Sequence, residues 1–147
     1  MIYIFNIDGT LADLTHRLHF IQQQPADWDG FFAACQDDLP IESVISILRA
    51  LRKADHTILF VSGRSDAVRP ATVQWLNHFV GDCDAGLYMR RAGDHRTDDI
   101  VKGELLDALA KDWNIAHVAG VFEDRNQVVQ MYRGRGLRVF QVAEGNF

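Results

Sequence analysis

Short apolar runs alternate with longer amphipathic stretches along this chain. The apolar runs at residues 2–5, 58–61, 117–122 and 138–142 predict buried strands, and a shorter run at 87–89 predicts one more. Strands without a polar face are typical of a parallel sheet that is covered by helices on both sides. The pattern therefore favours a sheet in the middle of the fold.

Apolar residues recur at helical spacing between these runs. They predict helices over 41–51, 67–79, 100–109 and 128–132. Ser65 is a candidate N-cap for the second helix, with Pro70 in its first turn, and the fourth helix should stop near Gly134 and Gly136. Alternating strands and helices predict a three-layer, Rossmann-like α/β fold with a doubly wound parallel sheet.

Residues 12–40, called here the cap segment, interrupt this rhythm between the first strand and the first long helix. We expect one or two short helices over the sheet edge, forming a small cap on a single domain of residues 1–147. His16 and His19 lie three residues apart, but no third metal ligand is evident, so a structural or substrate-contact role is favoured. Trp28, Phe31 and Phe32 are expected in the core of the cap segment, with base stacking as the alternative.

Composition narrows the class of protein without identifying a function. The chain has 147 residues, 48% of them hydrophobic and 24% charged, which excludes a disordered tail, a collagen-like repeat and a disulfide scaffold. Its net charge of -5 excludes a strongly cationic nucleic-acid coat. Two distant cysteines, Cys35 and Cys83, and the lack of an apolar run of membrane-spanning length predict a cytoplasmic protein with no membrane partner.

Residues with phosphate and metal chemistry follow the predicted strands. In an open parallel sheet, ligands bind beyond the carboxyl ends of the strands. A carboxylate there can attack phosphorus or hold Mg²⁺, and glycine lets backbone N–H groups approach an anion. The candidates are Asn6, Asp8, Gly9 and Thr10 after the first strand, Ser62, Gly63 and Arg64 after the second, Glu123 and Asp124 after the third, and Lys102 in a helix.

These residues carry a resemblance to a known family. Asn6–Leu11, Ser62–Arg64, Lys102 and Glu123–Asp124 resemble, in order and spacing, the four motifs of the haloacid dehalogenase superfamily of phosphohydrolases. The segments 61–64, 93–102, 123–129 and 141–147 are similar to the 3′-phosphatase half of phage polynucleotide kinase–phosphatases. No G-x-x-x-x-G-K-[ST] loop is present, so the kinase half is absent from this chain.

The resemblance implies a two-step phosphatase mechanism. The residue at position 6 attacks the phosphate and forms an aspartyl-phosphate, while Asp8 acts as general acid and then as general base. Mg²⁺ is held by the side chain at position 6, the main-chain carbonyl of Asp8 and the Asp124 carboxylate. Ser62 and Lys102 neutralise charge on the transferring group.

Substrate-binding residues follow from the same resemblance and from the arginines near the strand ends. The set is Gly9, Thr10, Gly63, Arg64, Arg91 and Arg96. The expected substrate is a phosphorylated nucleic-acid end or a nucleotide, and a phage-encoded protein would act in the host cytoplasm. A small-molecule nucleotidase and a non-catalytic phosphate- or nucleic-acid-binding module are the alternatives, and whether chains associate as homo-oligomers is left open.

Position 6 departs from the family pattern, because the family has Asp where this chain has Asn6. An amide lacks an anionic oxygen, so the chain as written should be inactive or nearly so. Two interpretations are open: a laboratory replacement of Asp that traps bound substrate, or a natural Asn that binds phosphate without cleaving it. Asp8, Ser62, Lys102 and Asp124 are intact, which favours the first interpretation. Glu123 also departs, since that branch of the family usually has Asp there.

Overall fold

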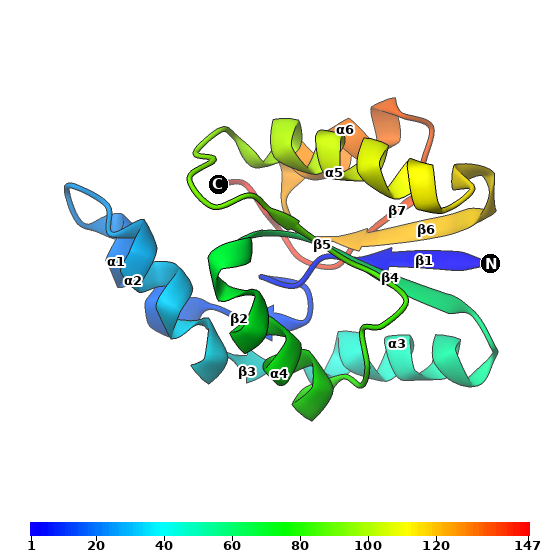
Figure 1. Ribbon diagram of the computed structural model, residues 1–147, viewed down its shortest axis with the longest axis horizontal. Helices are drawn as coiled ribbons and strands as arrows, with labels where there is room; N and C mark the ends of the chain where they lie inside the picture. Colours follow the sequence, from blue (N-terminus) through cyan, green and yellow to red (C-terminus); the bar gives the residue numbers. More distant parts are fainter.

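The computed structural model describes residues 1–147 and contains a five-stranded parallel sheet with the strand order β5-β4-β1-β6-β7 (Figure 1). Its strands are β1 (Ile2–Phe5), β4 (Thr57–Ser65), β5 (Leu87–Arg90), β6 (Val118–Glu123) and β7 (Val139–Gln141). In the central register, Ile4 lies between Leu59 of β4 and Val121 of β6. The predicted α/β fold class is confirmed.

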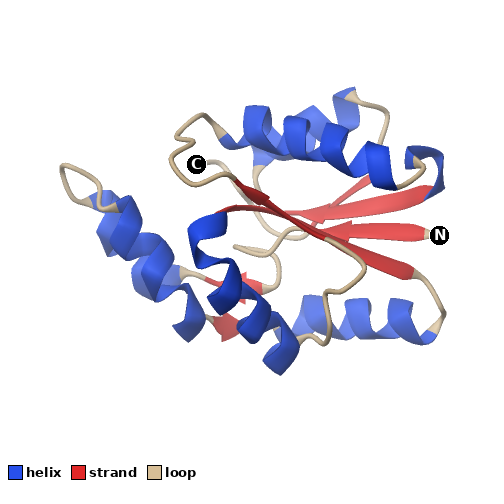
Figure 2. Cartoon of the chain, viewed as in Figure 1, coloured by secondary structure: helices blue, strands red, loops and turns tan.

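Helices cover both faces of this sheet (Figure 2). One side carries α3 (Glu42–Lys53) and α4 (Arg69–Phe79), and the other carries α5 (Asp98–Asp112) and α6 (Asn126–Gly134). Neighbouring residues of β1 point to opposite faces of the sheet. Phe5 packs in the core under α3 and α4, and Ile4 packs in the core under α5 and α6. Both residues are fully buried, which explains why the strand is apolar without alternation.

Most predicted elements are observed with ends shifted by a few residues, and the boundary between β4 and α4 differs most in kind. Strand β4 continues through polar residues as far as Ser65, with an irregular register between Ser62 and Ser65. A short 3₁₀ helix (Asp66–Val68) precedes α4, and the Ser65 side chain caps it by accepting a hydrogen bond from the N–H of Ala67. Ser65 therefore caps this short helix, whereas the predicted cap of α4 is wrong, because Val68 is its N-cap and makes no side-chain capping bond. Pro70 lies in the first turn of α4, as predicted.

The cap segment lies beyond the carboxyl ends of the central strands, where α1 and α2 project from the body of the molecule (Figure 1). It contains the short helices α1 (His19–Gln22) and α2 (Trp28–Ala33), the 3₁₀ helices η1 (Thr15–Arg17) and η2 (Ala34–Asp37), and the strands β2 (Ala12–Asp13) and β3 (Leu39–Pro40). The antiparallel pair β2–β3 was not predicted, because two-residue strands are too short to produce a periodic pattern.

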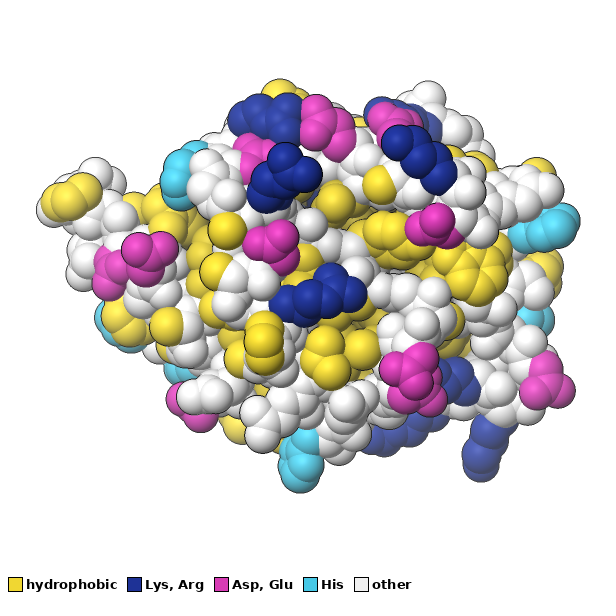
Figure 3. All heavy atoms as spheres, viewed as in Figure 1, with side chains coloured by type: hydrophobic (Ala, Val, Ile, Leu, Met, Phe, Trp, Pro, Cys, Tyr) yellow, Lys and Arg dark blue, Asp and Glu magenta, His cyan; other side chains and the backbone are white.

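Charges of both signs are interspersed with hydrophobic side chains on the face that Figure 3 shows. This distribution agrees with the modest net charge of -5. None of the helices has the length and apolar character that crossing a membrane requires.

Candidate active site

The carboxyl ends of β1 and β6 bring three buried polar side chains together. Lys102, near the start of α5, donates hydrogen bonds from Nζ to Asn6 Oδ1 (3.0 Å) and to Glu123 Oε2 (2.8 Å). The exposed fractions of Asn6, Lys102 and Glu123 are 4%, 2% and 0%. The sequence motifs thus converge at one edge of the sheet, as expected for parallel strands.

The amide nitrogen of Asn6 is surrounded by oxygen atoms. It donates to the Asp8 carbonyl (2.7 Å), Asp124 Oδ1 (2.8 Å), Glu123 Oε1 (3.0 Å) and Thr10 Oγ1 (3.3 Å). An NH₂ group has two hydrogens, so four acceptors exceed what it can satisfy fully. The surrounding oxygens form a cage that suits a positive charge.

Gly9 allows this cage to close. Its φ is +78°, and a β-carbon at this position would overlap the Asp124 carboxylate. A side chain at position 9 would therefore strain the turn and push Asp124 away from Asn6. The role of Gly9 is to permit close approach of a protein carboxylate.

The cage fits Mg²⁺ only in part while residue 6 is asparagine. Carbonyl and carboxylate oxygens at Asp8 and Asp124 are ligands that Mg²⁺ prefers. The single amide oxygen of Asn6, however, accepts the Lys102 hydrogen bond, so its NH₂ faces the oxygens that would bind a cation. Rotating the amide by half a turn would direct the NH₂ group at the Lys102 ammonium. The structure has no group of three or more His, Cys, Asp and Glu side chains placed to hold a metal ion.

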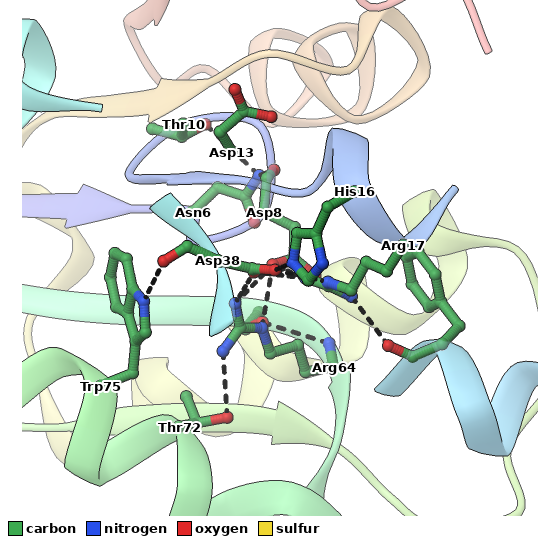
Figure 4. A network of polar contacts seen from close by, with 12 residues as sticks. Asn6, Asp8, Thr10, Asp13, His16, Arg17, Asp38, Arg64, Thr72 and Trp75 are labelled. Atoms are coloured by element: carbon green, nitrogen blue, oxygen red, sulfur yellow. Dashed lines mark hydrogen bonds and ion pairs between the residues drawn. The ribbon is translucent and has the colours of Figure 1, made fainter. Parts of the chain in front are cut away.

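Asp8 is held by two arginines through one of its two oxygens (Figure 4). Arg17 Nη2 lies 2.7 Å from Asp8 Oδ1, and Arg64 Nε donates to the same oxygen at 2.9 Å. Burial alone would raise the pKa of Asp8, but the positive charges of Arg64 and Arg17 outweigh burial and lower the pKa. The Asp8 side chain remains 20% exposed and lines the cavity of the site.

The arginines are themselves fixed by Asp38, which lies at the end of the cap segment. Asp38 Oδ2 accepts from Nη2 of Arg17 (2.7 Å) and of Arg64 (2.8 Å), and His16 Nε2 lies 2.8 Å from Asp38 Oδ1. Trp75 of α4 donates to the Asp38 carbonyl at 2.8 Å. Figure 4 shows these side chains pointing toward Asp38 from three parts of the chain.

Arg17 and Asp38 are site residues that the sequence analysis missed. Both are buried in a segment whose other polar residues are mostly exposed, and no motif marks them. His16 belongs to the same network, and His19 Nδ1 lies 3.1 Å from the His16 carbonyl, so the two histidines do not form a metal pair. Their structural interpretation is the one that the contacts support.

Glu123 and Lys102, which are buried beside Asn6, shift each other's pKa. Burial raises the pKa of Glu123 to about 7, although Lys102 opposes the shift. Burial would lower the pKa of Lys102, but the carboxylates of Glu123 and Asp98 outweigh burial and raise the pKa. Lys102 is therefore a permanent positive charge at the base of the site.

The site opens into a cavity of about 340 Å³. Among the predicted site residues, this cavity is lined by Asn6, Asp8, Gly63, Arg96, Lys102 and Asp124. Further residues come from two sides: Leu14, Leu18, Ile21, Trp28, Phe31 and Phe32 from the cap segment, and Arg90, Asp94, His95, Thr97, Asp98, Glu123, Arg125 and Phe147 from the body.

Several predicted site residues, among them the predicted catalytic residue Ser62, do not line the cavity. Arg64 is fully buried and directs its guanidinium at Asp8, Asp38 and Thr72, so it positions Asp8 where substrate contact was expected. Ser62 is also fully buried, and its Oγ accepts from the N–H of Arg64 at 3.1 Å. Gly9 and Thr10 lie beneath the site, with Thr10 donating to Asp124 Oδ1 at 3.0 Å.

The two loop arginines differ from each other. Arg91 is exposed and does not line the cavity. Arg96 lines it, but its guanidinium is bound by Asp94 (2.8 Å) and by Glu104 (2.7 Å). Arg90, which was not assigned a role, is 8% exposed, donates to the Gly63 carbonyl at 2.7 Å and pairs with Asp98.

Comparison with known proteins agrees with this geometry. The family model of the polynucleotide kinase PNKP phosphatase domain, which is of the haloacid dehalogenase type, matches residues 1–147. The chain belongs to this family. The resemblance stated from the motifs is therefore confirmed.

Solved and curated relatives extend the comparison. A chain in the structure of the Pnkp1/Rnl/Hen1 RNA repair complex is 32% identical with a TM-score of 0.82, over 99% of this chain and 43% of that chain. A protein of Autographa californica nuclear polyhedrosis virus, named as a bifunctional polynucleotide kinase/RNA ligase, is 27% identical over 128 residues, 87% of this chain and 17% of that protein. The chain thus spans less than half the length of either relative.

A more distant structure shares the fold. D,D-heptose 1,7-bisphosphate phosphatase from B. bronchiseptica, complexed with magnesium and phosphate, is 14% identical with a TM-score of 0.62, over 95% of this chain and 79% of that chain.

Proposed function

We propose that residues 1–147 form a single phosphatase domain, capped by residues 12–40, that acts on a phosphomonoester at a polynucleotide 3′ end. The observation that carries this proposal is the placement of residue 6. Its side chain lies at the carboxyl end of β1, between the Lys102 ammonium and the oxygens of Asp8 and Asp124. The relatives named for polynucleotide kinase and RNA repair favour a nucleic-acid end over a free metabolite.

An aspartate at position 6 would complete this arrangement. One carboxylate oxygen would keep the Lys102 hydrogen bond, and the other would face the Asp8 carbonyl and Asp124. The Asp8 carbonyl, Asp124 and residue 6 would hold Mg²⁺, which would supply positive charge to neutralise the phosphate. An oxygen of this carboxylate can attack phosphorus in line with the leaving oxygen, so that an aspartyl-phosphate forms as the bond between phosphorus and the leaving oxygen breaks.

Asp8 is placed to handle the protons of both steps. It is ionised in the free site because of Arg17 and Arg64, so it can accept a proton from the water that hydrolyses the intermediate. An anionic phosphate bound beside it raises the pKa of Asp8, which favours donation to the leaving oxygen in the first step. Lys102 stabilises the charge on the transferring group.

In the chain as it stands, Asn6 blocks this cycle. The amide has no anionic oxygen, and its NH₂ group occupies the space among the metal-binding oxygens. We therefore expect phosphate binding with little or no turnover, and turnover after Asn6→Asp. A small-molecule nucleotidase would show little salt dependence, whereas a polymer bound through several phosphates weakens as salt rises.

Phosphate release with Mg²⁺ tests the proposal on two substrates, a 3′-phosphorylated oligonucleotide and a 3′-mononucleotide. Asn6→Asp should release phosphate and the parent should not. Asn77→Asp, the same change at an exposed position of α4, should stay as inactive as the parent. Equal turnover by the parent and Asn6→Asp would contradict residue 6 as the nucleophile. Inactivity of both on both substrates would overturn the 3′-end assignment and leave a different phosphomonoester substrate or the binding-module alternative.

A further inference from the structure

The three aromatic residues of helix α2 play different roles in the structure. Phe31 is 6% exposed and lies under Arg17, whose guanidinium carbon is 4.3 Å from the centre of the Phe31 ring. Trp28 is 45% exposed, and Phe32 is half-buried. Phe31 therefore packs in the interior of the cap segment, whereas Trp28 and Phe32 have exposed ring surface.

The exposed rings of Trp28 and Phe32 are held in place by contacts with neighbouring aromatic rings. The Trp28 ring packs at 85° against Phe31 with 5.8 Å between ring centres, and its centre is 6.1 Å from that of Phe32 with 32° between the planes. Aromatic pairs at these separations hold one another in place. An exposed ring that is already immobilised loses little conformational freedom when a planar ligand packs on it.

The cavity that these rings line has both polar and apolar walls. Asn6, Asp8, Lys102 and Asp124 are among its polar lining residues, and the apolar side chains of the lining come largely from the cap segment. Its volume of about 340 Å³ falls at the lower end of the range of roughly 300–1,000 Å³ that is typical of small-molecule sites. The cavity therefore has room for one planar group attached to one phosphate.

We propose that Trp28 and Phe32 form a stacking surface, called here the base seat, that binds the terminal nucleobase of the substrate whose phosphate lies at Lys102. This inference rests on the proposed function and names the part of the substrate that the cap segment recognises. Every base has a π-face, so stacking on aromatic rings tolerates all four bases. The seat therefore favours any nucleoside phosphate over a phosphomonoester that lacks a base.

Binding to the parent chain tests this directly, because Asn6 should allow titration without turnover. The probes are the four nucleoside 3′-monophosphates, glycerol phosphate and inorganic phosphate, each followed by calorimetry. Nucleotides should bind more tightly than glycerol phosphate and differ little among themselves. Trp28→Ala should weaken nucleotide binding by roughly 5- to 150-fold and leave the affinity for inorganic phosphate unchanged.

Matched variants separate recognition from folding. Trp28→Tyr keeps a stacking ring and should retain most of the affinity, and Phe32→Ala should lose affinity for nucleotides alone. Leu39→Ala removes an exposed apolar side chain of the same segment, outside the cavity, and should change nothing. The melting temperature of each variant shows whether the cap segment is still folded.

The outcomes distinguish the two proposals. Equal affinity for nucleotides and glycerol phosphate, or an equal loss for nucleotide and inorganic phosphate in Trp28→Ala, would overturn the base seat while leaving the phosphate site in place. Strong discrimination among the four bases would overturn stacking as its basis. Failure of every phosphate probe to bind the parent and Asn6→Asp would overturn the proposed function together with the base seat.

Discussion

Replacing Asn6 by Asp should destabilise the metal-free protein even though it restores the family's nucleophile. The Asn6 NH₂ group donates to Asp124 Oδ1 at 2.8 Å and to Glu123 Oε1 at 3.0 Å. A carboxylate cannot donate, so these two hydrogen bonds are lost. The new Asp carboxylate would also lie at hydrogen-bond distance from the carboxylates of Asp124 and Glu123. The position is 4% exposed, which leaves little water to screen the repulsion.

The expected loss of stability can be worked out from the two hydrogen bonds that the Asn6 NH₂ group can make at one time. A hydrogen bond to a charged group contributes about 1.5–3 kcal/mol to stability, so losing two costs roughly 3–6 kcal/mol before relaxation. Protonation of one of the three carboxyl groups would relieve part of this, and we expect a net loss of about 3–5 kcal/mol near neutral pH. That is a large fraction of the 5–15 kcal/mol that is typical of a folded domain.

Urea denaturation in the presence of EDTA and then of excess Mg²⁺ measures the effect. Asn6→Asp should be less stable than the parent in EDTA and should regain about 3 kcal/mol at a Mg²⁺ concentration a hundredfold above its dissociation constant. The parent should respond weakly to Mg²⁺, because its amide competes for the same oxygens. Asn77→Asp should stay within about 0.5 kcal/mol of the parent in both conditions. If the parent gained as much from Mg²⁺ as the variant, the inference that the amide excludes the cation would be wrong.

Three further expectations concern the groups around residue 6. Asp38→Ala removes one of the two carboxylates that the buried Arg17 and Arg64 share and leaves them only Asp8. Urea denaturation should therefore show a loss of about 3–5 kcal/mol, and an unchanged stability would contradict the central role of Asp38. The pKa of Glu123 is about 7 in the folded protein and 4.5 ordinarily, so the folded state binds the proton more tightly. This contribution to stability is fully present below pH 4.5 and is lost as the pH rises through 7. The parent should therefore lose roughly 3 kcal/mol relative to Glu123→Gln between pH 4.5 and 8 in matched thermal melts, whereas parallel curves would show an ordinary pKa. Arg91→Ala should leave the dissociation constant for inorganic phosphate unchanged by calorimetry, and a clear weakening would return Arg91 to the substrate site.

The core and the position of the site were predictable because they depend on local pattern and on a general property of parallel sheets. An apolar run such as residues 2–5 is buried on both faces, so its strand was found within one residue of its observed bounds. Residues that follow such strands meet at one edge. That rule predicted that Asn6 and Asp124 meet, whereas Lys102, in a helix, was assigned to the site by the family resemblance.

The network around Asp8 could not be predicted in the same way. Arg17 and Asp38 are 21 residues apart and meet because the cap segment folds back, closed by strands of two residues each. Such short strands have no periodicity. For Arg64, the motif identified the residue but not the direction of its guanidinium, which depends on the carboxylate that the cap segment supplies.

Asp38 also has a consequence for motion. Hydrogen bonds join it to Arg17 in the cap segment, to Arg64 on β4 and to Trp75 on α4, all of them buried. A cap swinging away as a rigid lid would have to separate these charges, which are buried. The cap segment and the sheet should therefore open as one cooperative unit, so that amide hydrogen exchange near residue 17 reports the same opening free energy as exchange in β4. Substrate would then enter along the mouth of the cavity while Asp8 stays held by Arg17 and Arg64.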